Sequence, residues 1–187
     1  MPRTASQFKE MKDQRVASIF EAALPLFIEF GTDKITVDKI CIKAKCSHGL
    51  VYHYFKDTDD IYNALIKLEQ FKNIKASLIG DTKNKLAIDV LKNFVEVLLK
   101  ASEDKDLSMF AHLVLNEEGK NAFKDVLIKT LKQGQKEGEV LGGDPNDLAN
   151  LFIYFFKGLY YKNMTTKKEI EIPSVDVVMY LFKKNRY

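Results

Sequence analysis

The sequence contains few of the features that mark an enzyme or a metalloprotein. It has three histidines, His48, His53 and His112, and none lies in a metal-ligand or catalytic pattern. A Gly-rich phosphate loop and a Ser/His/Asp arrangement are also missing. Asp59-Asp60 is better explained as acidic charge at the start of a helix. We therefore expect no enzymatic activity, no cofactor and no bound metal.

Long apolar runs are absent as well. A membrane-spanning helix needs about 20 consecutive apolar residues, and Lys or Asp interrupts every candidate stretch here. Residues 1–7 lack the apolar segment of a signal peptide. With 187 residues, 46% of them hydrophobic, the chain can bury a good core in one compact unit or two small ones. We expect a soluble cytoplasmic protein with no membrane partner.

Cysteine is scarce, and so is net charge. Cys41 and Cys46 lie five positions apart with no further cysteines to complete a zinc site, so we interpret them as small core residues rather than redox groups. The net charge is +3, and residues 1–58 carry nine basic against seven acidic side chains. This is a weak electrostatic footprint for a nucleic-acid partner.

The chain is organised around residues 36–55, whose pattern predicts two short helices joined by a tight turn. Thr36 is placed to cap the first helix, and Ser47 repeats this start signal. Apolar residues at helical spacing follow Thr36, at Val37, Ile40, Cys41 and Ala44. Because only Lys45 and Cys46 separate the two helices, they must cross sharply, as in a helix-turn-helix.

The remaining sequence predicts an all-α fold of about nine helices. A first helix is expected over 8–30, with a kink or break at Pro25 and an end at Gly31. We expect a helix-turn-helix head over 1–57 and a connecting helix over 58–79, capped by Asp57 or Thr58. Residues 80–187 carry longer, more apolar helices, with a break at Asn116–Gly119, and form a second domain.

The late helices predict a dimer. Asp144-Pro145 starts a helix, and residues 148–161 are apolar almost all round, which a surface helix of a monomer cannot be. Gly158 and Ala149 allow close approach. The predicted interface residues come from this helix and from 174–182: Leu148, Leu151, Phe155, Leu159, Val175, Val178, Met179 and Phe182. The alternative is that both segments complete a larger internal core.

The second domain is also where a small-molecule pocket is expected. Its aromatic and aliphatic excess favours an apolar or aromatic ligand. The candidate pocket residues are Phe94, Met109, Phe110, His112, Phe123, Leu127, Phe152 and Phe156. Under the alternative interpretation most of them are ordinary core residues.

Residues 15–61 resemble the DNA-binding region of the TetR family of bacterial repressors. Arg15, Ile19, Ala22-Ala23, Phe27 and Gly31 are similar to its first helix, Ile35–Cys41 to its second, and Ser47–Phe55, ending in Tyr-His-Tyr-Phe, to its recognition helix. The resemblance implies a helical effector and dimerisation domain downstream, a double-stranded DNA operator, and an apolar ligand that releases it. The DNA-contacting residues that it implies are Thr36, Lys45, Ser47, His48, Gly49, Leu50, Tyr52, His53, Tyr54 and Lys56.

Among these residues, hydroxyl groups suit phosphate contacts, whereas His48, Gly49, Leu50 and His53 are expected nearest the base edges. Core packing is an equal alternative for Tyr54. Three positions depart from the family pattern: Lys45 replaces a turn glycine, Thr58 a lysine and Cys41 an alanine. We expect a homodimeric, ligand-responsive repressor. The alternative is a helical dimeric interaction module whose head has lost strong DNA binding.

Overall fold

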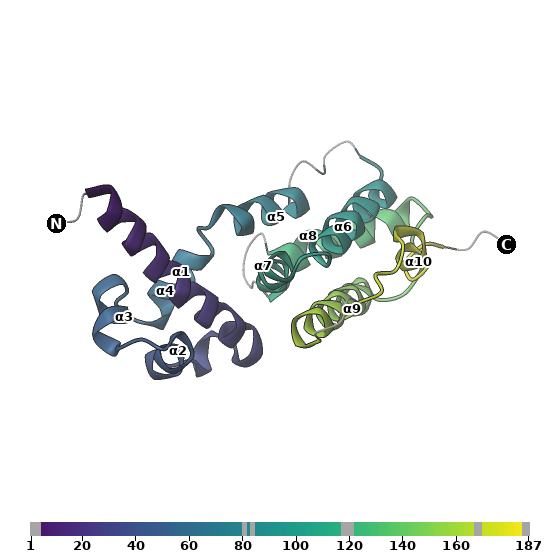
Figure 1. Cartoon of the computed structure of the whole chain (residues 1–187). Coiled ribbons are helices and arrows are strands. Elements are labelled where there is room, and N and C mark those ends of the chain that lie inside the picture. Colours follow the sequence, from purple (N-terminus) through teal and green to yellow (C-terminus); the bar gives the residue numbers. More distant parts are fainter. Residues whose placement is uncertain (1–4, 80–81, 83–84, 117–121, 167–169, 185–187) are drawn as a thin grey trace. The chain divides into compact units, whose positions relative to one another are not determined.

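The structure is a computed structural model that describes residues 5–79, 82, 85–116, 122–166 and 170–184. These residues form ten α-helices and one 3-10 turn (Figure 1), so the predicted all-α fold is confirmed. The chain divides into two compact units between Leu68 and Glu69. Within the described residues, no helix is long and apolar enough to cross a membrane.

The N-terminal unit consists of α1 (Ala5–Phe30), the 3-10 turn η1 (Thr32–Lys34), α2 (Val37–Ala44), α3 (His48–Tyr54) and α4 (Thr58–Leu65). Helix α1 packs against α2 and α4, and α2 packs against α3. Its core is mainly aliphatic, and it includes the fully buried side chains of Ile19, Ile40, Val51, Ile61 and Leu65. This core holds α2 and α3 in the crossed arrangement that the sequence predicts.

The start and end signals of the two short helices work as predicted. The side chain of Thr36 accepts a hydrogen bond from the backbone N–H of Lys39, and that of Ser47 accepts one from Leu50. Helix α2 ends at Lys45, which is left-handed with φ 52° and ψ 45°. The turn thus keeps the left-handed conformation although a lysine takes the place of glycine.

One local prediction is wrong. The single connecting helix over 58–79 is two helices, α4 and α5 (Glu69–Ile79), because the chain turns at residues 66–68. Of the kink or break predicted at Pro25, the break does not occur, since α1 continues through it to Phe30, and Gly31 then ends the helix with φ 78°. Of the two caps considered for α4, the structure uses Asp57, whose carboxylate accepts the N–H of Asp60 at 2.8 Å.

The C-terminal unit contains α5, α6 (Ala87–Ala101), α7 (Lys105–Asn116), α8 (Phe123–Lys136), α9 (Pro145–Thr165) and α10 (Val175–Met179). Helix α9 packs against α7 and α8, and α6 packs against α8 and α10. The carboxylate of Asp144 accepts the N–H of Asn146 at 2.7 Å, so the predicted Asp144-Pro145 helix start is confirmed. Beyond Asn116, the break expected at 116–119 lies outside the described residues.

The C-terminal segment folds back onto the connection between α8 and α9. The N–H of Leu141 donates to the carbonyl of Phe182, and the N–H of Lys184 donates to that of Glu139, both at 2.9 Å. Phe182 is buried, and its ring contacts that of Phe152. The last helix is therefore built into the core of its own unit.

Candidate functional site

The surface around α3 presents hydrogen-bonding side chains to solvent. His48, Gly49, Tyr52 and His53 are exposed, and 57% of Tyr52 is accessible although it is a large aromatic residue. Val51, on the opposite side of the helix, is fully buried. The helix thus divides into one face that anchors it and one that carries polar tips. This is the division that a helix lying in a DNA groove requires.

The two capping hydroxyls keep a second hydrogen-bonding capacity. Thr36 Oγ1 lies 3.4 Å from Lys39 N, and Ser47 Oγ lies 3.3 Å from Leu50 N. In both contacts the oxygen accepts, so the hydroxyl hydrogen can still be donated to a phosphate oxygen. Both residues are exposed.

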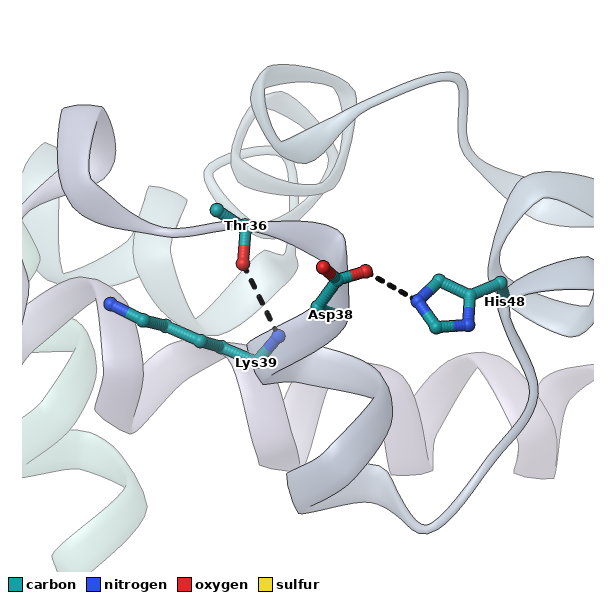
Figure 2. A network of polar contacts seen from close by, with 4 residues as sticks. All are labelled: Thr36, Asp38, Lys39 and His48. Atoms are coloured by element: carbon teal, nitrogen blue, oxygen red, sulfur yellow. Dashed lines mark hydrogen bonds and ion pairs between the residues drawn. The ribbon is translucent and has the colours of Figure 1, made fainter.

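A side-chain pair joins the starts of α2 and α3. His48 Nε2 lies 2.5 Å from Asp38 Oδ1 (Figure 2), and the two side chains are 56% and 72% exposed. Because a carboxylate can only accept, the imidazole hydrogen in this contact belongs to Nε2. Sequence reasoning missed Asp38. An acidic residue in the first turn of α2, ten positions before a histidine in the first turn of α3, is the signal that could have found it.

The other predicted contact residues differ in exposure. Lys45 and Lys56 are exposed, whereas Leu50 and Tyr54 are half-buried. The Tyr54 ring packs edge to face against His53, with centroids 4.8 Å apart. Tyr54 therefore combines the two roles that the sequence left open, since part of it packs and part of it remains accessible.

The two cysteines lie in α2 and in the turn that follows it. Cys41 is buried and Cys46 is half-buried, and both are free thiols. Burial, reinforced by the neighbouring Cys46, raises the pKa of the Cys41 thiol. Because the thiolate is the reactive form, this environment disfavours redox chemistry at Cys41. The described residues contain no group of three or more His, Cys, Asp or Glu side chains that could hold a metal ion.

Most of the predicted pocket residues form a packed aromatic core in the C-terminal unit. Phe123 contacts Phe94 and Phe152, and Phe152 contacts Phe156, with ring centroids 4.9 to 6.0 Å apart. Leu127 is fully buried among the same helices, Phe110 is buried, and Met109 is half-buried. The aromatic core is therefore filled by its own side chains.

His112, the remaining predicted pocket residue, is a buried polar residue of α7. Its side chain is buried, and Nδ1 has no hydrogen-bond partner among the described residues. Burial, with a smaller contribution from the charge of Lys157, lowers its pKa from 6.5 to about 4. The imidazole is consequently neutral near pH 7, with one unused hydrogen-bonding atom inside the unit.

Neighbouring buried polar groups are all paired. The side-chain amide of Asn163 donates to the Ser102 carbonyl at 2.9 Å and to Ser108 Oγ at 3.0 Å. The Tyr160 hydroxyl donates to the Leu98 carbonyl at 2.9 Å, and burial raises the pKa of this hydroxyl well above 10. These bonds tie α9 to α6 and α7, and the unpaired atom of His112 lies one helical turn beyond Ser108.

A cavity of about 440 Å³ opens between the end of α5 and the start of α6. Of the predicted pocket residues, it is lined by Phe94 alone. Its lining includes the polar residues Ser77, Asp89 and Asn93. The sequence did not indicate this hollow, because it is created by how the two helix ends meet.

One face of α9 and part of α10 remain apolar and exposed. Leu151 is 47% exposed and Tyr154 65%. Other exposed apolar residues are Tyr161, Val177, Tyr180 and Leu181, while Leu148, Phe155, Leu159 and Val175 are half-buried. Val178, Met179 and Phe182, predicted at a dimer interface, are instead buried in their own unit, and so is Ala149. The exposed residues of α10 were missed because its register was not predicted.

The capped, crossed pair α2–α3 defines the chain as a helix-turn-helix protein. Residues 19–65 match the family described as bacterial regulatory proteins, tetR family. This part of the chain is therefore similar to the DNA-binding region of the TetR family.

Two curated relatives and one solved structure are similar to this chain. An HTH-type transcriptional repressor of Mycobacterium tuberculosis is 31% identical over 103 residues, covering 50% of this chain and 54% of the relative. The fatty acid metabolism regulator protein of Bacillus subtilis is 26% identical over 162 residues, covering 78% and 80%. The crystal structure of an HlyIIR mutant protein shares the fold, with a TM-score of 0.64 and 18% identity over 90% of this chain and 93% of that one. This chain thus spans about half the length of the first relative.

Proposed function

We propose that this chain is a DNA-binding transcriptional regulator, acting as a homodimeric repressor that a small apolar ligand releases from a pseudo-palindromic operator. The exposed polar face of α3 carries the proposal. Tyr52, His53 and His48 lie there with no core to pack against, while the capping hydroxyls of Thr36 and Ser47 can donate to phosphates. The repressor of Mycobacterium tuberculosis is a relative with the same named activity.

The exposed apolar face of α9 and α10 supports the homodimer. Large apolar side chains are exposed on α9, at Leu151 and Tyr154, and directly after α10, at Tyr180. Apolar surface of this kind is usually covered by a partner. A second copy that pairs α9 with α9 would place two heads on one duplex, and an operator with matching two-fold symmetry follows.

The unpaired Nδ1 of buried His112 supports an effector in the C-terminal unit. An atom of this kind costs free energy until it finds a partner, so a ligand that supplies a hydrogen-bonding group gains from it. The same unit contains a cluster of touching aromatic rings, which suits a ligand whose remaining surface is apolar. The relative from Bacillus subtilis is named a fatty acid metabolism regulator, in agreement with such a ligand. Because the rings already touch one another, the ligand would have to separate them and select a second arrangement.

The repressor proposal is tested by selecting binding sites from a random-duplex library with the purified full chain at moderate salt. We expect a short pseudo-palindrome whose affinity falls steeply with salt. The combined substitution Tyr52→Ala and His53→Ala should abolish selection, while Asn63→Ala, an exposed change on α4, should leave it intact. Recovery of unenriched sequences by a folded, dimeric wild type would refute the proposal.

The alternative function is a dimeric interaction module whose head no longer binds DNA strongly. The nearly neutral head favours it, and so does the exposed negative charge of Asp38 beside α3. A module of this kind would keep its protein partner when Tyr52 and His53 are both replaced by Ala. The same double variant therefore separates the two functions.

A further inference from the structure

We propose that Asp38 is a specificity-determining residue of the head, because it holds the His48 imidazole in one orientation on the surface that meets DNA. This inference rests on the proposed DNA binding. Asp38 is not among the residues that we expect to contact DNA, and it acts through His48, which makes it a positioning residue.

The geometry of the pair fixes which part of His48 is available. His48 Nε2 is hydrogen-bonded to Asp38 Oδ1 at 2.5 Å. Figure 2 shows the second ring nitrogen on the side of the imidazole away from Asp38. Only Nδ1 and the ring edge can then meet a base. A histidine released from Asp38 could rotate about its side-chain bonds and offer either nitrogen, which would relax the choice of base pair.

The backbone on both sides of the pair is firmly placed. Asp38 lies in the first turn of α2, whose start is capped by Thr36, and His48 opens α3, whose start is capped by Ser47. Ile40 and Val51 anchor these two helices in the core, with no exposed surface. The pair therefore links two fixed helix starts, and the imidazole is the part that it orders.

Stability alone does not explain this pair. With 56% of the His48 and 72% of the Asp38 side chain exposed, an ion pair contributes little to the stability of the fold. A carboxylate beside a DNA-reading helix also repels phosphates. Asp38 thus lowers affinity for every duplex, and positioning of His48 offsets this cost at the cognate sequence only.

Two substitutions separate orientation from charge. Asp38→Asn keeps an acceptor oxygen for His48 Nε2 but removes the negative charge. We expect it to raise affinity for operator and for random duplex by a similar factor of about two to five, leaving discrimination unchanged. Asp38→Ala removes both the acceptor and the charge. We expect a similar rise in affinity for random duplex, together with about a tenfold loss of discrimination at one base pair of each half-site.

The deciding experiment measures the affinity of the full-length dimer for the selected operator and all its single-base-pair variants. The proteins compared are wild type, Asp38→Ala, Asp38→Asn, His48→Ala and the double Ala variant, each checked for folding by its thermal midpoint. His48→Ala should relax the same base pair as Asp38→Ala, and the double variant should lose no more than either single variant. A purely structural role for Asp38 would lower the thermal midpoint without this one-position change.

The outcomes distinguish this inference from the function on which it rests. If wild type selects no operator, the proposed DNA-binding function is overturned, and the role of Asp38 with it. If wild type selects an operator but Asp38→Ala keeps the full base preference, or relaxes a different pair from His48→Ala, the role of Asp38 is overturned and the DNA-binding function stands. Loss of preference in Asp38→Asn equal to that in Asp38→Ala also contradicts positioning by a hydrogen bond.

Discussion

The two units differ in the burial of their polar side chains. In the N-terminal unit, His48, His53 and Tyr52 are exposed around α3. In the C-terminal unit, the polar side chains of Asn163, Ser108 and His112 are buried. Polar tips on a surface are satisfied by water and can exchange it for an external partner, whereas buried ones must be satisfied internally. The polar side chains of the first unit can thus bind a polar partner at the surface. Those of the second unit stabilise its fold, except for the unpaired Nδ1 of His112.

The units also differ in the space around their glycines. A Cβ added to Gly49, on α3, would meet just Ser47 Oγ, at 4.0 Å. A Cβ added to Gly134, on α8, would lie 2.3 Å from Val140 Cγ2 and 3.3 Å from the Cβ of Ala87. The open space at Gly49 lets an external partner approach the backbone closely. At Gly134 the missing side chain lets Val140 and Ala87 pack against the helix.

The largest expected effect concerns the exposed apolar face of the second unit. Leu151→Glu places a charge where we propose that the partner's α9 packs, and a charge buried without a counterion disrupts an interface. We expect the dimer dissociation constant to rise about 100-fold or more, as measured by sedimentation equilibrium.

The exposed Lys100→Glu on α6 is the matched control and should leave dimerisation unchanged. Because Leu151 is 47% exposed in the single chain, the monomer should stay folded. A dimer of unchanged strength in Leu151→Glu would show that this face has no partner and would break the contrast between the units.

The next effect is a pH dependence confined to the second unit. The pKa of His112 falls from 6.5 to about 4 on folding, so the unfolded chain binds more protons between these values. Stability is complete above about pH 6.5 and decreases as the pH falls toward 4, by about 3 kcal/mol at most. Urea unfolding followed at several pH values between 7.5 and 4 measures this loss.

Two histidine variants control this measurement. His112→Leu should remove most of the pH dependence, and it should not lower stability at pH 7.5, since it also removes the unpaired Nδ1. His53→Ala, at an exposed position, should retain the wild-type pH profile. A marked loss of stability in His112→Leu at pH 7.5 would mean that Nδ1 is satisfied by bound water.

The glycine comparison predicts effects of opposite sign. Gly134→Ala should destabilise the second unit by about 1–3 kcal/mol, because Val140 and Ala87 must shift. Gly49→Ala should stabilise the first unit by up to about 1 kcal/mol through helix propensity and weaken operator binding. Chemical unfolding and operator titration of both variants measure these changes. Tight operator binding by Gly49→Ala would show that the space beside Gly49 is not used by DNA.

Much of the first unit could be predicted from the sequence because its signals are local. Thr36 and Ser47 cap the helices whose starts they were predicted to mark. The Asp38–His48 pair could not be predicted, because a contact between two side chains depends on the crossing of α2 and α3. Local pattern reading also missed the break at residues 66–68, where the apolar spacing continues across the turn.

In the second unit, less could be predicted, because burial there depends on how six helices pack. The apolar pattern of α9 predicted the helix and two of its positions, exposed Leu151 and fully buried Phe156, but not the exposure of Tyr154 and Tyr161. It did not give the register of α10, so Val178 and Phe182 were assigned to the surface when they fill the core. The cavity between α5 and α6 likewise arises from tertiary packing.

The smallest expected effect concerns Lys45, a residue of the first unit with both a backbone role and a predicted DNA-contact role. Its N–H donates to the Ile42 carbonyl, and the next N–H, of Cys46, donates to Cys41, a pairing that requires the left-handed conformation after α2. A lysine pays about 1 kcal/mol for this conformation. Lys45→Gly should therefore stabilise the first unit by about 0.5–1 kcal/mol.

Lys43→Gly is the matched control, since Lys43 is exposed within α2, and it should destabilise the unit by about 1 kcal/mol. If Lys45 also contacts a phosphate, Lys45→Gly should weaken binding to every duplex equally and reduce the salt dependence by about one ion. Urea unfolding and salt-dependent DNA titration of the two variants separate the backbone effect from the charge effect. If Lys45→Gly and Lys43→Gly destabilised the unit equally, the left-handed conformation of Lys45 would carry no backbone strain. An unchanged salt dependence in Lys45→Gly would remove this residue from the proposed contact surface and leave Thr36, Ser47 and the face of α3 to hold the duplex.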